Sequence, residues 1–206
     1  MNIKDIIRCN NLPLNVVIQN ILLTIRFDCQ WMNFGDIFDN INPKDEFIQY
    51  TSYGDQMKYS ENISKWNKDR IIDHKSTTEY KYDHIKINFS NCFTRLYETG
   101  EMLVIVDDLS IDIDEHIDII MNLLSDYNPQ ILKVAILKIR FSIKFKTINK
   151  DIMNDAKQIT NITFRLVDDE IFGEVKEFSK INSFYEFIKN EIVFLDTPNI
   201  NFYVTI

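Results

Sequence analysis

Closely spaced acidic side chains are the first residues in the sequence that could do chemistry. They form the pairs Asp107-Asp108 and Asp112 with Asp114, and the run Asp168-Asp169-Glu170. Carboxylates arranged in this way can hold Mg²⁺ or a two-metal site. Acids at helix starts and hairpin turns more often cap helices and aid solubility, and no basic or hydroxyl partner stands at motif spacing nearby. The sequence therefore favours a structural role for these acids, without a metal site.

Other catalytic signatures are missing from the sequence. It contains no G-x-G-x-x-G, P-loop, H-E-x-x-H or G-x-S-x-G motif. Its histidines, His74, His84 and His116, are scattered. Its cysteines, Cys9, Cys29 and Cys92, have no close Cys or His partners, so we expect reduced thiols. Together these observations predict a binding protein rather than an enzyme, with no cofactor and no small-molecule substrate.

A basic strand is the better candidate for function. From Leu137 to Phe145, apolar residues alternate with polar ones, and the polar positions carry Lys138, Arg140, Lys144 and, next in the series, Lys146. Residues two apart on one strand face lie about 6–7 Å from each other, which is close to the phosphate spacing along one DNA strand. The alternative is an edge strand whose lysines prevent aggregation. The pattern alone leaves both interpretations open.

Composition limits where a nucleic acid could bind. The formal net charge of −8 argues against general attraction to DNA or to an anionic membrane, so binding would need a local basic patch. No apolar run reaches the length of a bilayer span, and the first residues lack the order of a signal peptide. We therefore expect an intracellular location.

The first half of the chain predicts strands with two helices. Val16 to Phe27 alternates as a half-buried strand, with Asn20, Leu22, Thr24 and Arg26 on its polar face. Asn33 precedes a short helix that ends at Asn42-Pro43, and residues 43–79 are predicted to be a long loop or insertion. Three strands are then expected at Tyr80–Phe89, Cys92–Tyr97 and Met102–Val106, with Gly100 in the turn between the last two. A helix follows, with Asp112 and Glu115 as a capping box and an apolar stripe from Ile113 to Leu124.

The second half repeats much of this order. After the basic strand come a short helical stretch near Asp151–Gln158 and a hairpin of Ile159–Val167 with Ile171–Phe178. A helix capped by Ser183 and Glu186 is expected to run to Leu195, before a terminal strand at Ile200–Ile206. We interpret residues 1–127 as one repeat with an insertion at about 43–79, and 128–206 as a second, degenerate repeat. The predicted class is α+β, an antiparallel sheet with its helices on one side.

Two segments resemble the TATA-box-binding protein (TBP) family. Gln19-Asn20-Ile21, with Thr24 and Cys29 after it, is similar to that family's first strand, Q-N-I-V-x-T-V-N-L-G-C. Tyr80 to Tyr97 aligns without a gap to F-A-A-V-I-M-R-I-R-E-P-x-T-T-A-L-I-F, and the six residues from Tyr97 to Met102 align to F-S-S-G-K-M. The resemblance covers about a third of the chain. It implies a saddle, in which two pseudo-repeats form one curved antiparallel sheet with helices on its convex face.

The resemblance also implies a DNA site on the concave face. In the family an aromatic residue at each end of the second segment wedges between base steps of the minor groove, and these places hold Tyr80 and Tyr97 here. Asn20 matches an asparagine that reads minor-groove acceptors, and Lys86 matches a phosphate-contacting arginine. Glu101 departs from the family by replacing the lysine of S-G-K. The DNA-contacting residues that we expect are Asn20, Leu22, Thr24, Arg26, Tyr80, Lys86, Tyr97, Lys138, Arg140, Lys144 and Lys146.

Two functions remain in competition. The first is a TBP-like initiation factor that binds AT-rich promoter DNA in the minor groove and recruits basal initiation factors or RNA polymerase. The second keeps the fold but loses the DNA, as a protein-interaction module whose acidic helix meets basic partners. The many Ile, Asn, Lys and Asp residues, against only Ala135 and Ala156, indicate an AT-rich genome. The resemblance implies a divergent member of the family from a large DNA virus or a protist, located in the nucleus or, if viral, in the cytoplasmic virus factory or virion. The position of the basic strand separates the two functions, since DNA binding requires it on the concave face.

Overall fold

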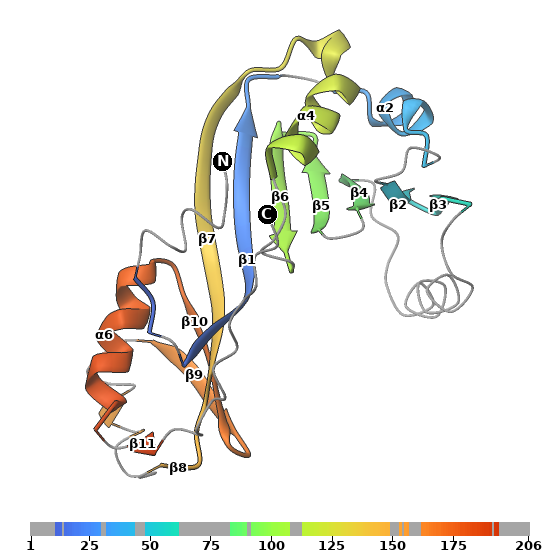
Figure 1. Cartoon of the computed structure of the whole chain (residues 1–206). Coiled ribbons are helices and arrows are strands. Elements are labelled where there is room, and N and C mark those ends of the chain that lie inside the picture. The colour runs from blue at the N-terminus through green and yellow to red at the C-terminus, as the bar shows by residue number, and fades with distance from the viewer. Residues whose placement is uncertain are drawn as a thin grey trace, which may run out of the picture. The chain divides into compact units, whose positions relative to one another are not determined.

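The computed structural model describes residues 11–13, 15–29, 32–43, 48–61, 83–89, 92–107, 113–148, 153, 155–156 and 162–190, and the backbone of 192–193. Its fold is α+β and mainly antiparallel, as the alternation predicted (Figure 1). The hydrogen-bonded strand order is β3-β2-β4-β5-β6-β1-β7-β10-β9. Residue contacts divide the chain into two units, one holding Leu22–Leu137 and the other holding Lys4–Ile21 with Lys138–Ile206. The long strands β1 (Val16–Phe27) and β7 (Ile131–Lys144) contribute to both units.

Strand β1 has the bounds and the faces that its sequence predicted. Ile21, Leu23, Ile25 and Phe27 are buried, while the residues between them are half-buried or exposed. The strand ends where Phe27 N donates to Gly100 O at 2.7 Å. Gly100 has a φ of +76°, and a Cβ there would lie 2.9 Å from the carbonyl oxygens of Phe27 and Cys29. Glycine is therefore required at this turn for both backbone conformation and space.

The first unit pairs β4 (His84–Phe89), β5 (Cys92–Tyr97) and β6 (Glu101–Val106) in antiparallel register. Two helices cover one face of this sheet: α2 (Phe34–Asn40) and α4 (Ile113–Leu123), which is followed by the short helix η1 (Ser125–Tyr127). Phe34 packs edge-on against Tyr53 of β2, with ring centroids 5.9 Å apart, and Phe89 packs edge-on against His116 of α4 at 4.8 Å. The opposite face of the sheet has no described helix on it and is called the open face below.

The segment expected to be an irregular insertion carries two further strands. β2 (Ile48–Tyr53) pairs with β4, and β3 (Gln56–Tyr59) pairs with β2 across the turn at Gly54. The prediction of a loop was wrong for residues 48–59, because Ile48 and Thr51 are buried and fixed by the sheet. The sequence shows no alternation there, because the register with β4 shifts between Ile48 and Tyr50 and the two buried residues are three apart. The rest of the predicted insertion, residues 44–47 and 62–79, lies outside the described residues.

The second unit contains β7 from Lys138 onward, β10 (Glu170–Val175) and β9 (Thr163–Val167), all antiparallel and covered on one face by α6 (Phe178–Ile188). Phe184 of α6 contacts Phe141 at 6.0 Å and Phe164 at 5.1 Å between ring centroids. A small second sheet pairs β8 (Thr147–Ile148) with β11 (Ile192–Val193). Burial of each such large apolar side chain stabilises the fold by about 1.5–3 kcal/mol.

The bounds of three elements, α6, β10 and β7, differ from the prediction. The helix expected from Ser183 to Leu195 begins at Phe178 and ends at Ile188, because Phe178, Ile181, Phe184 and Ile188 form the buried stripe. Ser183 therefore lies inside the helix, where its hydroxyl donates to Ser179 O, and does not cap it. β10 ends at Val175 rather than at Phe178. β7 begins at Ile131, and Leu137 is 37% exposed rather than buried in the core. The expected terminal strand at 200–206 and Asp112 lie outside the described residues.

Candidate nucleic-acid interface

The open face of the first unit combines cations with aromatic rings. Lys86 of β4 and Arg95 of β5 stand directly opposite each other in the register, and Asn88 stands opposite Phe93. Directly paired residues of an antiparallel sheet point to the same face. Arg95 also lies over the Phe93 ring, with its guanidinium carbon 5.4 Å from the centroid. The centre of this face therefore carries two positive charges next to a stacked ring.

Tyrosines extend the same face on both sides of the cations. Tyr50 of β2 pairs with Asn88 and with Tyr59 of β3, and the two tyrosine rings lie 6.4 Å apart. Burial raises the pKa of Tyr50, and the neighbouring Tyr59 raises it further, while Arg95 opposes the shift. Both phenols therefore remain neutral hydrogen-bond donors at physiological pH. Neutral donors and flat rings suit contact with bases and sugars better than with a charged partner.

Tyr97 closes the row at the other end of β5. It stands opposite His84 in the register, and the two rings lie 5.3 Å apart at 38°. His84 is 4% exposed, and its Nδ1 lies 2.6 Å from Asp83 Oδ1. Burial lowers the pKa of His84, against the raising effect of Asp83. The neutral imidazole therefore packs beside the half-exposed Tyr97 ring.

Glu101 is an acid on this open face of the first unit, at the position where the resemblance expects a lysine. Glu101 accepts a hydrogen bond from Thr24 Oγ1 at 2.7 Å, which joins the start of β6 to β1. The carboxylate is thus held by a residue that was itself expected to contact DNA. Thr24 and Leu22 are half-buried and Arg26 is exposed. This corner of the face is less basic than the Lys86–Arg95 centre.

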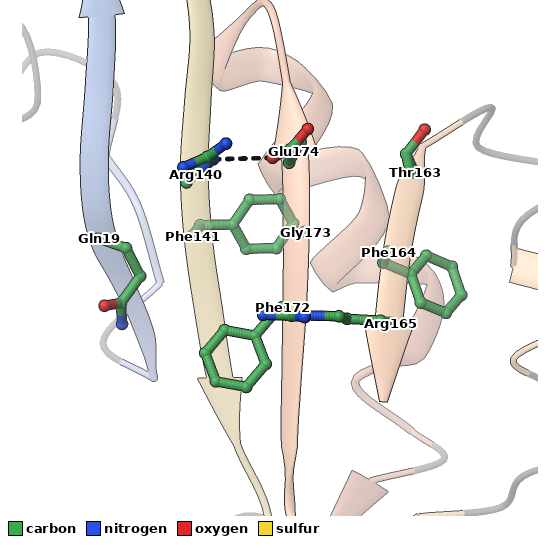
Figure 2. A pocket seen from close by; sticks show the side chains of 9 residues that line it. All are labelled: Gln19, Arg140, Phe141, Thr163, Phe164, Arg165, Phe172, Gly173 and Glu174. Atoms are coloured by element: carbon green, nitrogen blue, oxygen red, sulfur yellow. Dashed lines mark hydrogen bonds and ion pairs between the residues drawn. The ribbon is translucent and has the colours of Figure 1, made fainter. Parts of the chain in front are cut away.

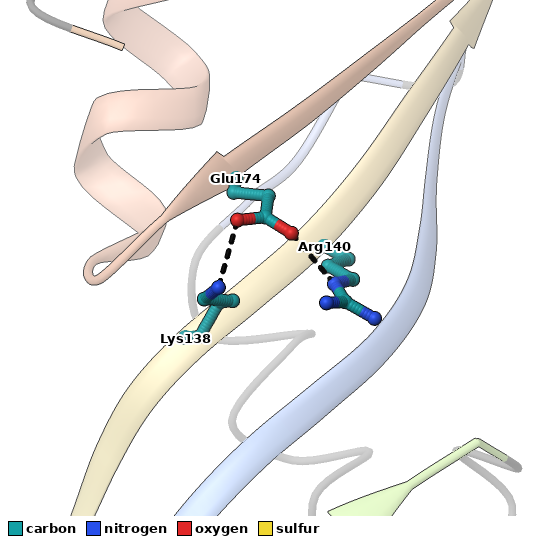
Figure 3. Close-up of polar contacts among 3 residues, drawn as sticks. All are labelled: Lys138, Arg140 and Glu174. Atoms are coloured by element: carbon teal, nitrogen blue, oxygen red, sulfur yellow. Dashed lines mark hydrogen bonds and ion pairs between the residues drawn. The ribbon is translucent and has the colours of Figure 1, made fainter. Parts of the chain in front are cut away.

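The open face of the second unit carries the basic strand, but its charges are partly neutralised. Glu174 of β10 forms ion pairs with Lys138 Nζ at 2.8 Å and Arg140 Nε at 2.7 Å (Figure 3). The hydrogen bond from Lys138, helped by Arg140, holds the pKa of Glu174 below its ordinary value. Lys144 stands opposite Glu170 in the register, and Lys146 is exposed beyond the end of β7. The edge-strand interpretation is wrong for this part of β7, because β10 and β1 flank it.

The chain has a counterpart among solved structures. The TBP of Methanococcus jannaschii matches it over 85% of this chain and 99% of that chain, with a TM-score of 0.48 and 8% sequence identity. No protein-family model matches the sequence, and no curated protein matches it.

The structure groups most of the predicted DNA-contacting residues into two separate sets. The first unit holds Leu22, Thr24, Arg26, Lys86 and Tyr97. The second unit holds Asn20 and the four basic residues from Lys138 to Lys146. Asn20 is half-buried on β1. Tyr80, the second expected wedge, lies outside the described residues.

Sequence reasoning missed four residues of the open face of the first unit: Tyr50, Tyr59, Phe93 and Arg95. The alternation of Cys92–Tyr97 places Phe93 and Arg95 on the face of Tyr97, and a tight pairing with Tyr80–Phe89 would have brought Arg95 beside Lys86. That signal was present in the sequence. The two tyrosines could not be found in this way, because their strands lie in the segment that looked irregular.

Among the described residues, no group of histidines, cysteines and acids is arranged to hold a metal ion. Cys29 and Cys92 are buried and free, and Cys9 lies outside the described residues. Within the described part of the chain, no helix is long and apolar enough to cross a membrane.

Proposed function

We propose that this protein binds double-stranded DNA through the open faces of its sheet, as a TBP-like initiation factor acting on AT-rich promoter sequences. The observation that carries the proposal is the pairing of Lys86 with Arg95 at the centre of a face otherwise rich in aromatic residues. Cations supply the phosphate contacts that dominate affinity for DNA. Rings and neutral donors next to them supply contacts with sugars and base edges.

The wedge part of the proposal rests on Tyr97. Its ring is half-exposed at the end of β5 and packs beside the buried His84 ring. Insertion of a wedge must offset the cost of unstacking a base step, a few kcal/mol. A ring that is held in place by a neighbouring side chain is therefore suited to this role. Its hydroxyl needs a polar partner or water, so we expect a shallower kink than phenylalanine produces.

The recruiting part of the proposal rests on the helical side of the molecule. The outer face of α4 carries the exposed acids Glu115 and Asp118, while Ile113, Ile117 and Ile120 face the sheet. An acidic helix that points away from the open face leaves DNA and protein partners on opposite sides of the first unit. We therefore assign basal initiation factors or RNA polymerase to this helix, and DNA to the open face.

A titration of labelled AT-rich and GC-rich duplexes at two salt concentrations tests the proposal. We expect binding that weakens steeply as salt rises, with a modest preference for the AT-rich duplex, because phosphate contacts outnumber base contacts on this face. No binding to either duplex at low salt would reject the proposal and favour the protein-interaction module. The double variant Lys86→Met with Arg95→Met is the matched negative control, since it keeps the apolar stems of both side chains.

A further inference from the structure

A hollow of about 540 Å³ lies on the second unit, apart from the Lys86–Arg95 face (Figure 2). Its floor is formed by the strands at Phe141, Phe164 and Gly173. Its walls are side chains of the open face, which come from β1, β7, β9 and β10: Gln19, Arg140, Thr163, Arg165, Phe172 and Glu174.

A stacked pair of side chains lies across this hollow. Arg165 of β9 and Phe172 of β10 are directly opposite in the register, and the guanidinium carbon of Arg165 lies 5.3 Å from the Phe172 centroid. Phe172 is half-buried, and its neighbours Ile171 and Gly173 face the other way, into the core. A ring placed here with a cation against it serves as a platform for another flat ring.

The remaining walls are polar and nearly balanced in charge. Arg140 is paired with Glu174 at 2.7 Å, and Gln19 Nε2 donates to Ser142 Oγ at 2.7 Å. The lining therefore holds two arginines and one glutamate, a net charge of one positive unit (2 − 1 = +1). The Thr163 hydroxyl and the Glu174 carboxylate supply further polar atoms at the rim. A ligand for this site needs a flat ring, a polar edge and a nearby negative charge.

We propose that the hollow holds one unpaired nucleobase of a single-stranded nucleic acid, stacked against Phe172 and Arg165. A base stacked inside a duplex has both of its faces covered by neighbouring base pairs, so it can use such a platform only after it is unstacked, which costs a few kcal/mol. An unpaired base offers a free face, hydrogen-bonding edges and an adjoining phosphate, which match the three features of the site. The site uses no residue of the first unit, so it can be tested separately from the Lys86–Arg95 pair.

The hairpin of β5 and β6 in the first unit can be compared with the hairpin of β9 and β10, which carries the stacked pair. Arg95 stands opposite Leu103 in the register, just as Arg165 stands opposite Phe172. The first unit therefore has the cation at the same place of its hairpin, but an aliphatic residue where the second unit has the ring. This difference makes Phe172 the residue to test.

The experiment measures fluorescence anisotropy of labelled eight-nucleotide oligo-dT, oligo-dA and oligo-U with the full chain. We expect Phe172→Leu to weaken single-strand binding about tenfold, within the range for losing one base–aromatic stack, and Phe172→Tyr to retain it. Phe187→Leu, which removes a half-buried ring from α6 that does not line the hollow, is the matched control and should change single-strand binding less than twofold. The comparison of oligo-dT with oligo-U shows whether DNA or RNA is preferred.

Two results would overturn the inference: no binding of any single strand by the wild type, or equal losses in Phe172→Leu and Phe187→Leu. Thermal unfolding of each variant confirms that it is folded, as expected for a half-exposed position on a sheet face. Duplex binding is measured on the same samples. If Arg95→Met weakens duplex binding and leaves single-strand binding unchanged, the two sites are separate. If the wild type does not bind duplex DNA at all, that result counts against the proposed function and not against this inference.

Discussion

Lys86 and Arg95 lie directly opposite each other on adjacent antiparallel strands. Like charges placed in this way destabilise a sheet, by a few tenths of a kcal/mol up to about 1 kcal/mol. Part of Arg95 is also buried, and its Nε has no hydrogen-bond partner among the described residues. The first prediction tests whether this pair of cations contributes to DNA binding at some cost in stability.

Replacing Arg95 with methionine should weaken duplex binding without weakening the fold. Each cation that no longer meets a phosphate reduces the slope of log affinity against log salt by about 0.9. The melting temperature should stay level or rise, since the repulsion with Lys86 is relieved. The measurement is a salt titration alongside a thermal melt, with Lys180→Met on the exposed side of α6 as the charge-matched control. An unchanged salt slope would show that Arg95 does not meet phosphate.

Removing the Tyr97 ring should reduce DNA bending more than it reduces affinity. A wedge offsets unstacking through the additional contact that a bent duplex permits, so Tyr97→Ala should leave a straighter complex. Energy transfer between dyes at the two ends of an AT-rich duplex measures this, with Tyr80→Ala tested in parallel. Tyr127→Ala is the control, because that hydroxyl contacts Asn33 N at 2.9 Å on the helical side. Equal end-to-end distances for wild type and both wedge variants would exclude wedging.

Neutralising Glu174 should raise nucleic-acid affinity. Glu174→Gln releases Lys138 and Arg140 from their ion pairs and leaves two cations available to phosphate. We expect a severalfold gain in affinity and a steeper salt dependence. Glu186→Gln, which removes an exposed acid paired with Lys189 on α6, is the matched control. Equal gains in both variants would assign the effect to net charge rather than to this site.

The same carboxylate should contribute to the acid sensitivity of the fold. The pKa of Glu174 is lowered in the folded state, so its contribution to stability is present above the ordinary value of 4.5 and is lost as pH falls through the lowered pKa. Above pH 5, unfolding of wild type and Glu174→Gln should therefore differ by a constant amount, and below pH 4.5 the difference should shrink. Denaturant unfolding at a series of pH values measures it. A constant difference down to pH 2 would contradict this assignment.

Gly173 should tolerate no side chain, despite lying in the middle of a strand. A Cβ there would lie 2.3 Å from Cζ of Phe141, whose ring covers the glycine. Gly173→Ala should destabilise the protein by about 1–3 kcal/mol through overpacking. Adding Phe141→Leu should make the alanine less costly, since the clash disappears. Denaturant unfolding of the two single variants and the double variant supplies the cycle, and additive effects would contradict the contact.

The thiol of Cys92 should be inert in the folded protein. Burial, with a smaller effect of Asp107, raises its pKa to about 12, and burial also raises the pKa of Cys29. Alkylation requires the thiolate, so iodoacetamide at pH 8 should modify both residues only as fast as the protein unfolds. Mass spectrometry of peptides after timed exposure, with and without urea, measures this. Rapid modification of Cys92 in native buffer would contradict its burial.

Local order in the chain was well determined by the sequence. Three elements appear as predicted: the strands Val16–Phe27 and Cys92–Tyr97 and the apolar stripe of α4. Alternation and helical periodicity show which side chains share a face, and the apolar face is the one that is buried. Gly100 was placed correctly for the same reason, since few other residues adopt its φ. Lys86 and Tyr97 were assigned to the polar faces of their strands, and the structure places both on the open face.

Tertiary structure alone decided which charges meet. Lys138 and Arg140 looked like a free basic row, but Glu174, more than thirty residues later, pairs with both, and only the register of β7 with β10 brings them together (Figure 3). The hairpin at 48–59 was likewise invisible, because pairing with β4 fixes those residues rather than their own periodicity. A sequence pattern reports the distribution of apolar and polar side chains along one strand. The partners across the sheet are set by long-range register, and register determines whether a row of cations is free to bind an anion.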